Sequence, residues 1–237
     1  MSDTLLLVGI NEIFSVISYP TKPILFADDL SIHLQTTNPQ HGHRVLQKTI
    51  NRILKWLFNH AFRISHPKTN VIIFEKRKSK TPFPPHLLDN HLIPIFETVK
   101  VGVRFHTCHS WLPHIEELKI KGKRATNILK YLTHPPTDCN RKTLLPLYQS
   151  LIRSILDYAA PVYGLAPPPQ LALLDTIQNS AIRLCTGAFR TSLALSLSAD
   201  ARIPPLHYRR LTLSAGLLFS IAQLPSTPIH DFPFNKT

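Results

Sequence analysis

The stretch Ile24-Leu25-Phe26-Ala27-Asp28-Asp29-Leu30-Ser31-Ile32-His33 sets two adjacent carboxylates inside an apolar run. After the pair, apolar and polar residues alternate, which predicts a half-buried strand with one face turned to a core. Aspartate is depleted in strands and favoured in tight turns. The pair Asp28-Asp29 therefore predicts the tip of a β-hairpin that covers about residues 24–34.

Two carboxylates at the tip of an apolar hairpin repel each other, because like charges a few ångströms apart are unfavourable. A divalent cation removes that repulsion, and Mg²⁺ prefers a few carboxylate oxygens together with water and substrate phosphates. An adjacent Asp-Asp pair by itself is also compatible with a plain solvated turn. The surrounding sequence decides between these two interpretations.

Phe26-Ala27-Asp28-Asp29 between apolar strands resembles the catalytic hairpin of reverse transcriptases, specifically those of non-LTR retrotransposons of the jockey and LINE type. Further motifs in family order extend the resemblance over nearly the whole chain. These motifs are Asn11-Glu12-Ile13, Phe62-Arg63-Ile64-Ser65-His66-Pro67-Lys68-Thr69, Val99-Lys100-Val101-Gly102-Val103-Arg104-Phe105, Ser154-Ile155-Leu156-Asp157-Tyr158, Arg183-Leu184-Cys185-Thr186-Gly187-Ala188-Phe189-Arg190-Thr191-Ser192 and Pro204-Pro205-Leu206.

The resemblance implies an α+β fold in which a partial polymerase palm (residues 1–110) precedes a mainly helical thumb and connection region (111–224) and a loose tail (225–237). It implies RNA-directed DNA synthesis with Mg²⁺ or Mn²⁺ as cofactor. The implied partners are an RNA template, an RNA–DNA duplex and deoxynucleotides. A retrotransposon protein of this type is expected in the cytoplasm and nucleus.

The resemblance also assigns roles to single residues. Asp28 is the stronger metal ligand and Asp29 the weaker one, because successive strand residues point to opposite sides. Lys68 occupies the family's Lys-Thr turn, where a cation can approach the leaving phosphates or donate a proton; the alternative is a loop lysine that is only solvated. The expected nucleic-acid-binding residues are Lys100, Gly102 and Trp111 in the primer-gripping segment, and Arg183 and Arg190 in the thumb. Either arginine could equally pair with a local carboxylate.

Two family features are not found before the hairpin: the first catalytic aspartate and the Pro-Gln-Gly motif of the nucleotide pocket. Asp3 and Glu12 are the only acidic residues that precede Asp28. In the grip segment Val101-Gly102 replaces the usual Leu-Gly. The chain alone is therefore expected to be inactive in polymerisation. The alternatives are a non-catalytic nucleic-acid-binding remnant of a mobile element and an inert product of a degenerate one.

Composition supports a globular chain that binds polyanions. The 237 residues are 43% hydrophobic and 17% charged, which indicates a folded chain. With 27 Lys and Arg against 14 Asp and Glu, the net charge is +13. Charge alone is compatible either with solubility only or with a nucleic-acid partner, and the polymerase-like motifs favour the nucleic acid. No apolar run reaches the roughly 20 residues that a membrane span needs.

The cysteines favour a reduced, intracellular chain. Cys108, Cys139 and Cys185 are odd in number and widely spaced, so a disulfide framework is not expected. His106, Cys108, His109 and His114 cluster in the sequence, but their spacing matches no paired-cysteine or finger pattern. Side chains beside a strand are the favoured interpretation, with a zinc site as the alternative.

Hydrophobic spacing and capping residues give the expected elements. Asn38-Pro39 is typical of a helix cap followed by a first-turn proline. Gly187 is typical of a helix stop. Helices are predicted over about 38–61, 112–132, 140–157, 169–186 and 205–223, with the remnant of a helix in 1–23; strands are predicted over about 70–74, 91–96 and 98–105, with a basic loop over 75–85.

Overall fold

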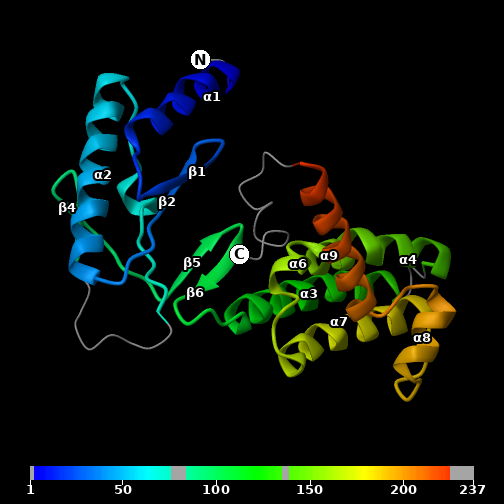
Figure 1. Ribbon diagram of the computed structural model, residues 1–237. Coiled ribbons are helices and arrows are strands. Elements are labelled where there is room, and N and C mark those ends of the chain that lie inside the picture. Colours follow the sequence, from blue (N-terminus) through cyan, green and yellow to red (C-terminus); the bar gives the residue numbers. More distant parts are fainter. Residues whose placement is uncertain (1–2, 76–83, 135–138, 225–237) are drawn as a thin grey trace. The chain divides into compact units, whose positions relative to one another are not determined.

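The computed structural model describes residues 3–75, 84–134 and 139–224, and it shows a mainly helical protein with small antiparallel strand pairs (Figure 1). The chain divides into two compact units, Met1–Val99 and Lys100–Thr237. Helix and strand are thus both present, as expected from the sequence. The predicted tail over 225–237 and most of the predicted loop over 75–85 lie outside the described residues.

The first unit is built around a hairpin and one long helix. In β1 and β2 the strands are antiparallel, and Phe26 lies opposite Asp29, so Ala27 and Asp28 form a two-residue turn. The predicted hairpin and its acidic tip are confirmed. The elements of this unit are α1 (Asp3–Asn11), η1 (Glu12–Val16), β1 (Lys22–Phe26), β2 (Asp29–His33), α2 (Pro39–Asn59), η2 (His66–Lys68), β3 (His86–Leu88) and β4 (His91–Ile93).

Helix α2 begins where the sequence predicts. The Asn38 side chain accepts hydrogen bonds from the backbone N–H groups of Gln40 and His41 at 3.0 and 3.3 Å, which satisfies donors that a helix start leaves open. Ile53, Trp56 and Leu57 recur at helical spacing and are buried together with Ile13 of η1. Leu30 and Ile32 of β2 pack against this small core. The core therefore anchors the hairpin to α2.

The predicted strands after α2 are only partly right. Residues 70–74 do not form a strand; Val71 makes a single parallel bridge to Ile95. The predicted strand over 91–96 is shorter, because β4 ends at Ile93, before Pro94, whose nitrogen carries no hydrogen for a strand ladder. β3 pairs with β4, and Asp89-Asn90 between them have positive φ angles of 49° and 63°. Asp and Asn tolerate this left-handed conformation better than most residues, which is why the turn forms there.

The predicted single strand over 98–105 is wrong. It is a hairpin of β5 (Thr98–Val101) and β6 (Val103–His106) that turns at Gly102. The φ angle of Gly102 is +67°, in the region that glycine enters without steric cost. The alternation of apolar residues gives no sign of this reversal.

The second unit is helical after that hairpin. The predicted helices over 112–132, 140–157, 169–186 and 205–223 are confirmed, and Gly187 ends its helix with a φ of 68°. Two short helices, α6 and α8, were not predicted. The elements are α3 (Leu112–Leu132), α4 (Arg141–Tyr148), a π-helical segment (Gln149–Arg153), α5 (Ser154–Asp157), α6 (Ala160–Tyr163), α7 (Pro168–Thr186), α8 (Ala194–Ala201) and α9 (Leu206–Gln223).

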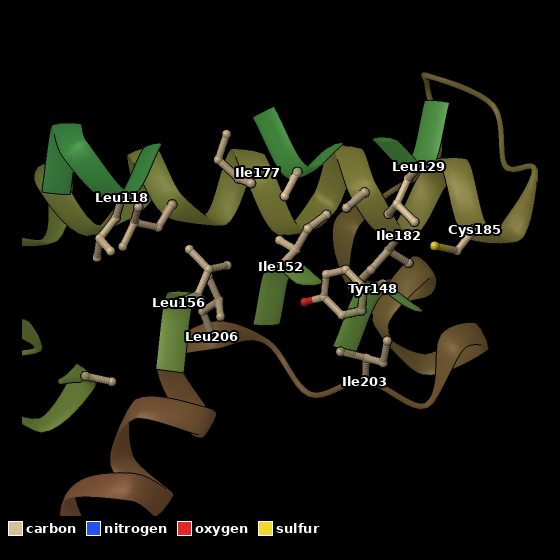
Figure 2. Packing of buried hydrophobic residues seen from close by; sticks show 14 of the residues in the cluster. Leu118, Leu129, Tyr148, Ile152, Leu156, Ile177, Ile182, Cys185, Ile203 and Leu206 are labelled. Atoms are coloured by element: carbon tan, nitrogen blue, oxygen red, sulfur yellow. The ribbon is translucent and has the colours of Figure 1, made fainter. Parts of the chain in front are cut away.

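The core of the second unit lies where α3 packs against α7. Figure 2 shows side chains from these two helices meeting those of the segment from α4 to α5. Among the fully buried residues are Leu129 of α3, Leu174 and Ile182 of α7, and Ile152 between α4 and α5. Each such side chain contributes about 1.5–3 kcal/mol relative to an exposed position.

This core also encloses polar groups, among them Tyr148 and Gln178. The Tyr148 hydroxyl donates to Gln178 Oε1 at 2.9 Å, and Gln178 Nε2 donates to the Pro204 carbonyl at 3.2 Å. Burial raises the pKa of Tyr148 to about 12, so the phenol stays protonated and remains a donor. The hydrogen bonds tie α4, α7 and the start of α9 to one another.

A carboxylate joins the π-helical segment to α9. Asp157 Oδ2 lies 2.8 Å from Arg209 Nη2, and Asp157 Oδ1 lies 3.7 Å from Arg153 Nε. Arg153 is only 8% exposed, so its charge depends on this neighbour. The pairing explains how a buried arginine is accommodated in the helical unit.

We predict that acid weakens the first unit through His86. This imidazole has no exposed surface, and its ring centroid lies 4.5 Å from that of His43. Burial, with a smaller contribution from His43, lowers the pKa of His86 to about 4. The unfolded chain takes up this proton below about pH 6.5, whereas the folded chain does so only near pH 4, so stability falls as the pH drops between these values. The cost between pH 7 and 5 is about 2 kcal/mol.

Urea unfolding followed by Trp56 fluorescence, in a Trp111→Phe background, measures this unit alone. His86→Leu should lose about 2 kcal/mol less stability between pH 7 and 5 than its parent. His41→Leu, at an exposed position, is the matched control and should keep the parental pH dependence. An unchanged pH dependence in His86→Leu would contradict the assignment.

Candidate metal-binding hairpin and nucleic-acid interface

The two carboxylates lie at the open end of the β1–β2 hairpin. Asp28 is the second residue of the turn, Asp29 is the first residue of β2, and both are exposed. Ala27, the first turn residue, has a φ of 53°, which a residue with a Cβ adopts only at a cost on the order of 1 kcal/mol. The hydrogen-bonded strands on either side hold it there. The two paired strands therefore hold the neighbouring Asp28 and Asp29 carboxylates in a turn that is exposed to solvent.

The donor set of the tip fits a hard divalent cation in part. Asp28 and Asp29 supply carboxylate oxygens, which Mg²⁺ and Mn²⁺ prefer. Within residues 3–75, 84–134 and 139–224, no group of three or more His, Cys, Asp or Glu side chains gathers as a metal site. A cation at the hairpin would therefore take its remaining ligands from water and from substrate phosphates.

Lys68 lies in a separate turn of the first unit. It ends η2, its backbone N–H donates to the Ser65 carbonyl at 3.2 Å, and its side chain is exposed. The side-chain amide of Asn70 donates to the Lys68 carbonyl at 3.1 Å. The Lys-Thr turn that the sequence predicts is present, and its ammonium group is accessible to an anionic ligand.

The grip-like segment forms the β5–β6 hairpin. Lys100 lies in β5, and Gly102 forms the turn. A Cβ built on Gly102 would lie 2.7 Å from the hydroxyl oxygen of Tyr158, closer than packed atoms allow. The absence of a side chain on Gly102 therefore lets Tyr158, of the same unit, approach the backbone closely.

Trp111 has a packing role. It stands directly before α3, is half-buried and packs against the helical core. Its ring centroid lies 5.8 Å from that of Phe105 and 6.4 Å from that of His114. The indole joins β6 to α3, and little of it is available to a base.

The two candidate arginines differ. Arg183, near the end of α7, donates through Nη2 to the Ser192 carbonyl at 3.0 Å, so it closes the loop that follows Gly187. Arg190, within that loop, is exposed. Of the pair, Arg190 is the one placed to contact a phosphate.

The sequence-predicted site residues fall into the two units by role. Asp28, Asp29 and Lys68 belong to the first unit. Lys100, Gly102, Trp111, Arg183 and Arg190 belong to the second. The residues to which the sequence assigns metal binding and catalysis therefore lie in the first unit, and those to which it assigns duplex contact lie in the second.

A basic face of α3 adds to the second unit's surface. Lys123, Arg124 and Lys130 are exposed along it. Lys121 differs, because its Nζ lies 2.9 Å from Glu117 Oε1. Exposed cations spaced along one helix suit contact with a phosphate backbone.

The zinc alternative finds no support in the geometry of the described residues. His106 Nδ1 accepts the backbone N–H of Cys108 at 3.1 Å, and His114 is buried with Nδ1 accepting the Arg104 N–H at 3.4 Å. Cys108 and His109 are exposed. One nitrogen of each of the His106 and His114 rings is thus engaged by a backbone N–H group.

Sequence reasoning overlooked two basic residues of the first unit. Arg52 and Lys55 of α2 line a hollow beside Trp56. Arg52 and Lys55 are three residues apart and directly precede Trp56, so a helix places the two cations on one face. This spacing was the signal that the sequence offered.

Comparisons with known proteins add no relative. No family model, no curated protein and no solved structure matches the chain. The resemblance to reverse transcriptases therefore depends on the motifs of the sequence alone. Among the described residues, no helix is long and apolar enough to cross a bilayer.

We predict that the hairpin binds Mn²⁺ weakly through Asp28 and Asp29. Titration of the chain with Mn²⁺, followed by the loss of the free-ion electron paramagnetic resonance signal, should give a site that Asp28→Asn removes and Asp29→Asn weakens. Asp89→Asn, at an exposed turn of the same unit, is the matched control and should leave binding unchanged. Equal losses in all three variants would show that binding reflects general charge only.

Proposed function

We propose that this chain is the palm-to-thumb part of an RNA-directed DNA polymerase of the non-LTR retrotransposon type. The observation that carries the proposal is the tight antiparallel hairpin with Asp28 and Asp29 at its exposed tip. A capped helix, α2, and the turn that contains Lys68 follow in the order of the family's motifs. Since an isolated Asp-Asp turn is common, it is this order that favours a polymerase over a solvated loop.

The chemistry of such an enzyme is the in-line transfer of a nucleotide to a 3′-hydroxyl. Divalent metal ions supply charge stabilisation for the attacking and leaving oxygens. In this chain, Asp28 would hold metal at the hairpin tip, with Asp29 as its weaker neighbour. Lys68, exposed on its own turn, would neutralise charge on the leaving phosphates.

The same geometry argues that the chain by itself does not polymerise. Two ions roughly 4 Å apart require carboxylates from two separate segments. Within the described part of the chain, no third acidic group joins the pair on the hairpin. We therefore propose binding of an RNA–DNA duplex as the activity that this chain retains.

Charge supports the retained binding. The chain carries a net charge of +13, and Lys123, Arg124 and Lys130 extend along the exposed face of α3. Contacts of this kind recognise the phosphate backbone and the shape of a duplex, and they do not read base sequence. The second candidate function, a non-catalytic nucleic-acid-binding remnant, rests on the same surface and differs only in having no catalytic role for the hairpin.

We predict no primer extension by the isolated chain. Incubation with an RNA template, a labelled DNA primer, deoxynucleotides and Mg²⁺ or Mn²⁺ should leave the primer length unchanged. Extension that disappears in Asp28→Ala would overturn the prediction of inactivity and would establish the hairpin as catalytic. Extension that persists in Asp28→Ala would point to a contaminating polymerase.

We predict salt-sensitive retention of an RNA–DNA duplex. Filter binding across a salt series should show affinity falling steeply as salt rises, because bound phosphates release counterions. The double variant Lys123→Gln, Lys130→Gln should reduce the salt slope by about 2, since each lysine that neutralises a phosphate adds about one unit to it. Arg44→Gln with Lys48→Gln, on α2 of the other unit, makes the same change in net charge and should keep the slope. A chain that retains no duplex at low salt would contradict the proposed function.

A further inference from the structure

The first unit has a hollow of about 450 Å³ beside α2 that shares no residue with the acidic hairpin. Its lining includes Ser15 and Ser18 from the segment around η1, and Arg52, Lys55, Trp56 and Asn59 from α2. The four α2 residues follow the i, i+3, i+4, i+7 spacing, so they share one face of the helix. The hollow is therefore formed by one helix face and the chain that crosses it.

The electrostatics of the hollow are one-sided. Arg52 and Lys55 place two positive charges in its wall, and no carboxylate lines it. Glu12, of η1, has a side chain that is 70% exposed, and its Oε2 lies 4.0 Å from His60 Nε2. The two cations thus face a concave space that no acidic side chain of its lining neutralises.

The lining of the hollow offers hydrogen-bond donors to a ligand that carries acceptor atoms. Arg52 Nη1 donates to Ser18 Oγ at 2.8 Å, which holds the guanidinium at the hollow and leaves its other N–H groups for a ligand. Because Ser18 accepts this bond, its own hydroxyl hydrogen is available to donate. Ser15 instead donates to the Glu12 carbonyl at 2.8 Å, so it offers the ligand no hydrogen. The Asn59 amide completes the set of donors.

We propose that this hollow binds the phosphate group of a small organic phosphate. A guanidinium fork matches two phosphate oxygens, and an adjacent ammonium adds a point charge. The hollow of about 450 Å³ is larger than a phosphate ion needs, so it leaves room for an organic part. Val16 and Trp56 supply the apolar part of its lining.

Isothermal titration of the full chain with adenosine monophosphate, inorganic phosphate and adenosine tests the proposal. Adenosine monophosphate should bind, inorganic phosphate should bind more weakly, and adenosine should not bind. Binding should weaken about a hundredfold in the double variant Arg52→Gln, Lys55→Gln, since each of the two hydrogen bonds to a charged group is worth about one factor of ten. Trp56 fluorescence in a Trp111→Phe background should change on binding.

The matched control is Arg44→Gln with Lys48→Gln, which removes two exposed charges from the same helix outside the hollow. It should keep the parental affinity, and both double variants should keep the parental thermal transition. The proposal is overturned if no phosphate compound binds, if adenosine binds as well as its monophosphate, or if both double variants weaken binding equally. Retention of the RNA–DNA duplex by Arg52→Gln, Lys55→Gln would show that the hollow acts separately from the proposed polymerase function.

Discussion

The packing of α3 against α7 is the contact on which the larger unit depends. The two helices bury a continuous apolar seam, and the segment from α4 to α5 closes it from a third side. Burial of that seam forces Tyr148, Gln178 and Arg153 out of water, so each needs an internal partner. The hydrogen bond from Tyr148 to Gln178 and the Asp157 carboxylate beside Arg153 meet this need. The hydrogen bond and the ion pair in this core are thus a consequence of apolar packing.

What the sequence could predict follows from how local each signal is. The long helices were predictable because their apolar spacing, the Asn38 cap and the Gly187 stop act within a few residues of the chain. The strands after α2 were less predictable, because a hairpin turn at Gly102 and a parallel bridge from Val71 to Ile95 depend on distant partners. The burial of His86 could not be predicted from the sequence either, because it depends on the packing of β3 near α2.

The candidate site shows the same division between local and distant information. The preference of aspartate for tight turns was sufficient to place Asp28 and Asp29 at a hairpin tip. It could not indicate that Ala27 would take a left-handed conformation, which follows from the register that pairs Phe26 with Asp29. Nor could it separate Arg183 from Arg190, because the first is engaged by the Ser192 carbonyl, which its own loop brings back to it.

Some residues of the sequence motifs make contacts within the unit, so other residues must supply the surface for the proposed nucleic-acid ligand. Trp111 and Arg183 support the fold, and Gly102, although exposed, makes room for Tyr158, so all three have contacts within the unit. Accessible positive charge is found instead at positions that include Lys123, Arg124 and Lys130 of α3, and Arg190. Cations on long, solvated side chains contact phosphates without reading bases. Under the proposed function, the second unit would therefore follow the shape and charge of a duplex rather than its base sequence.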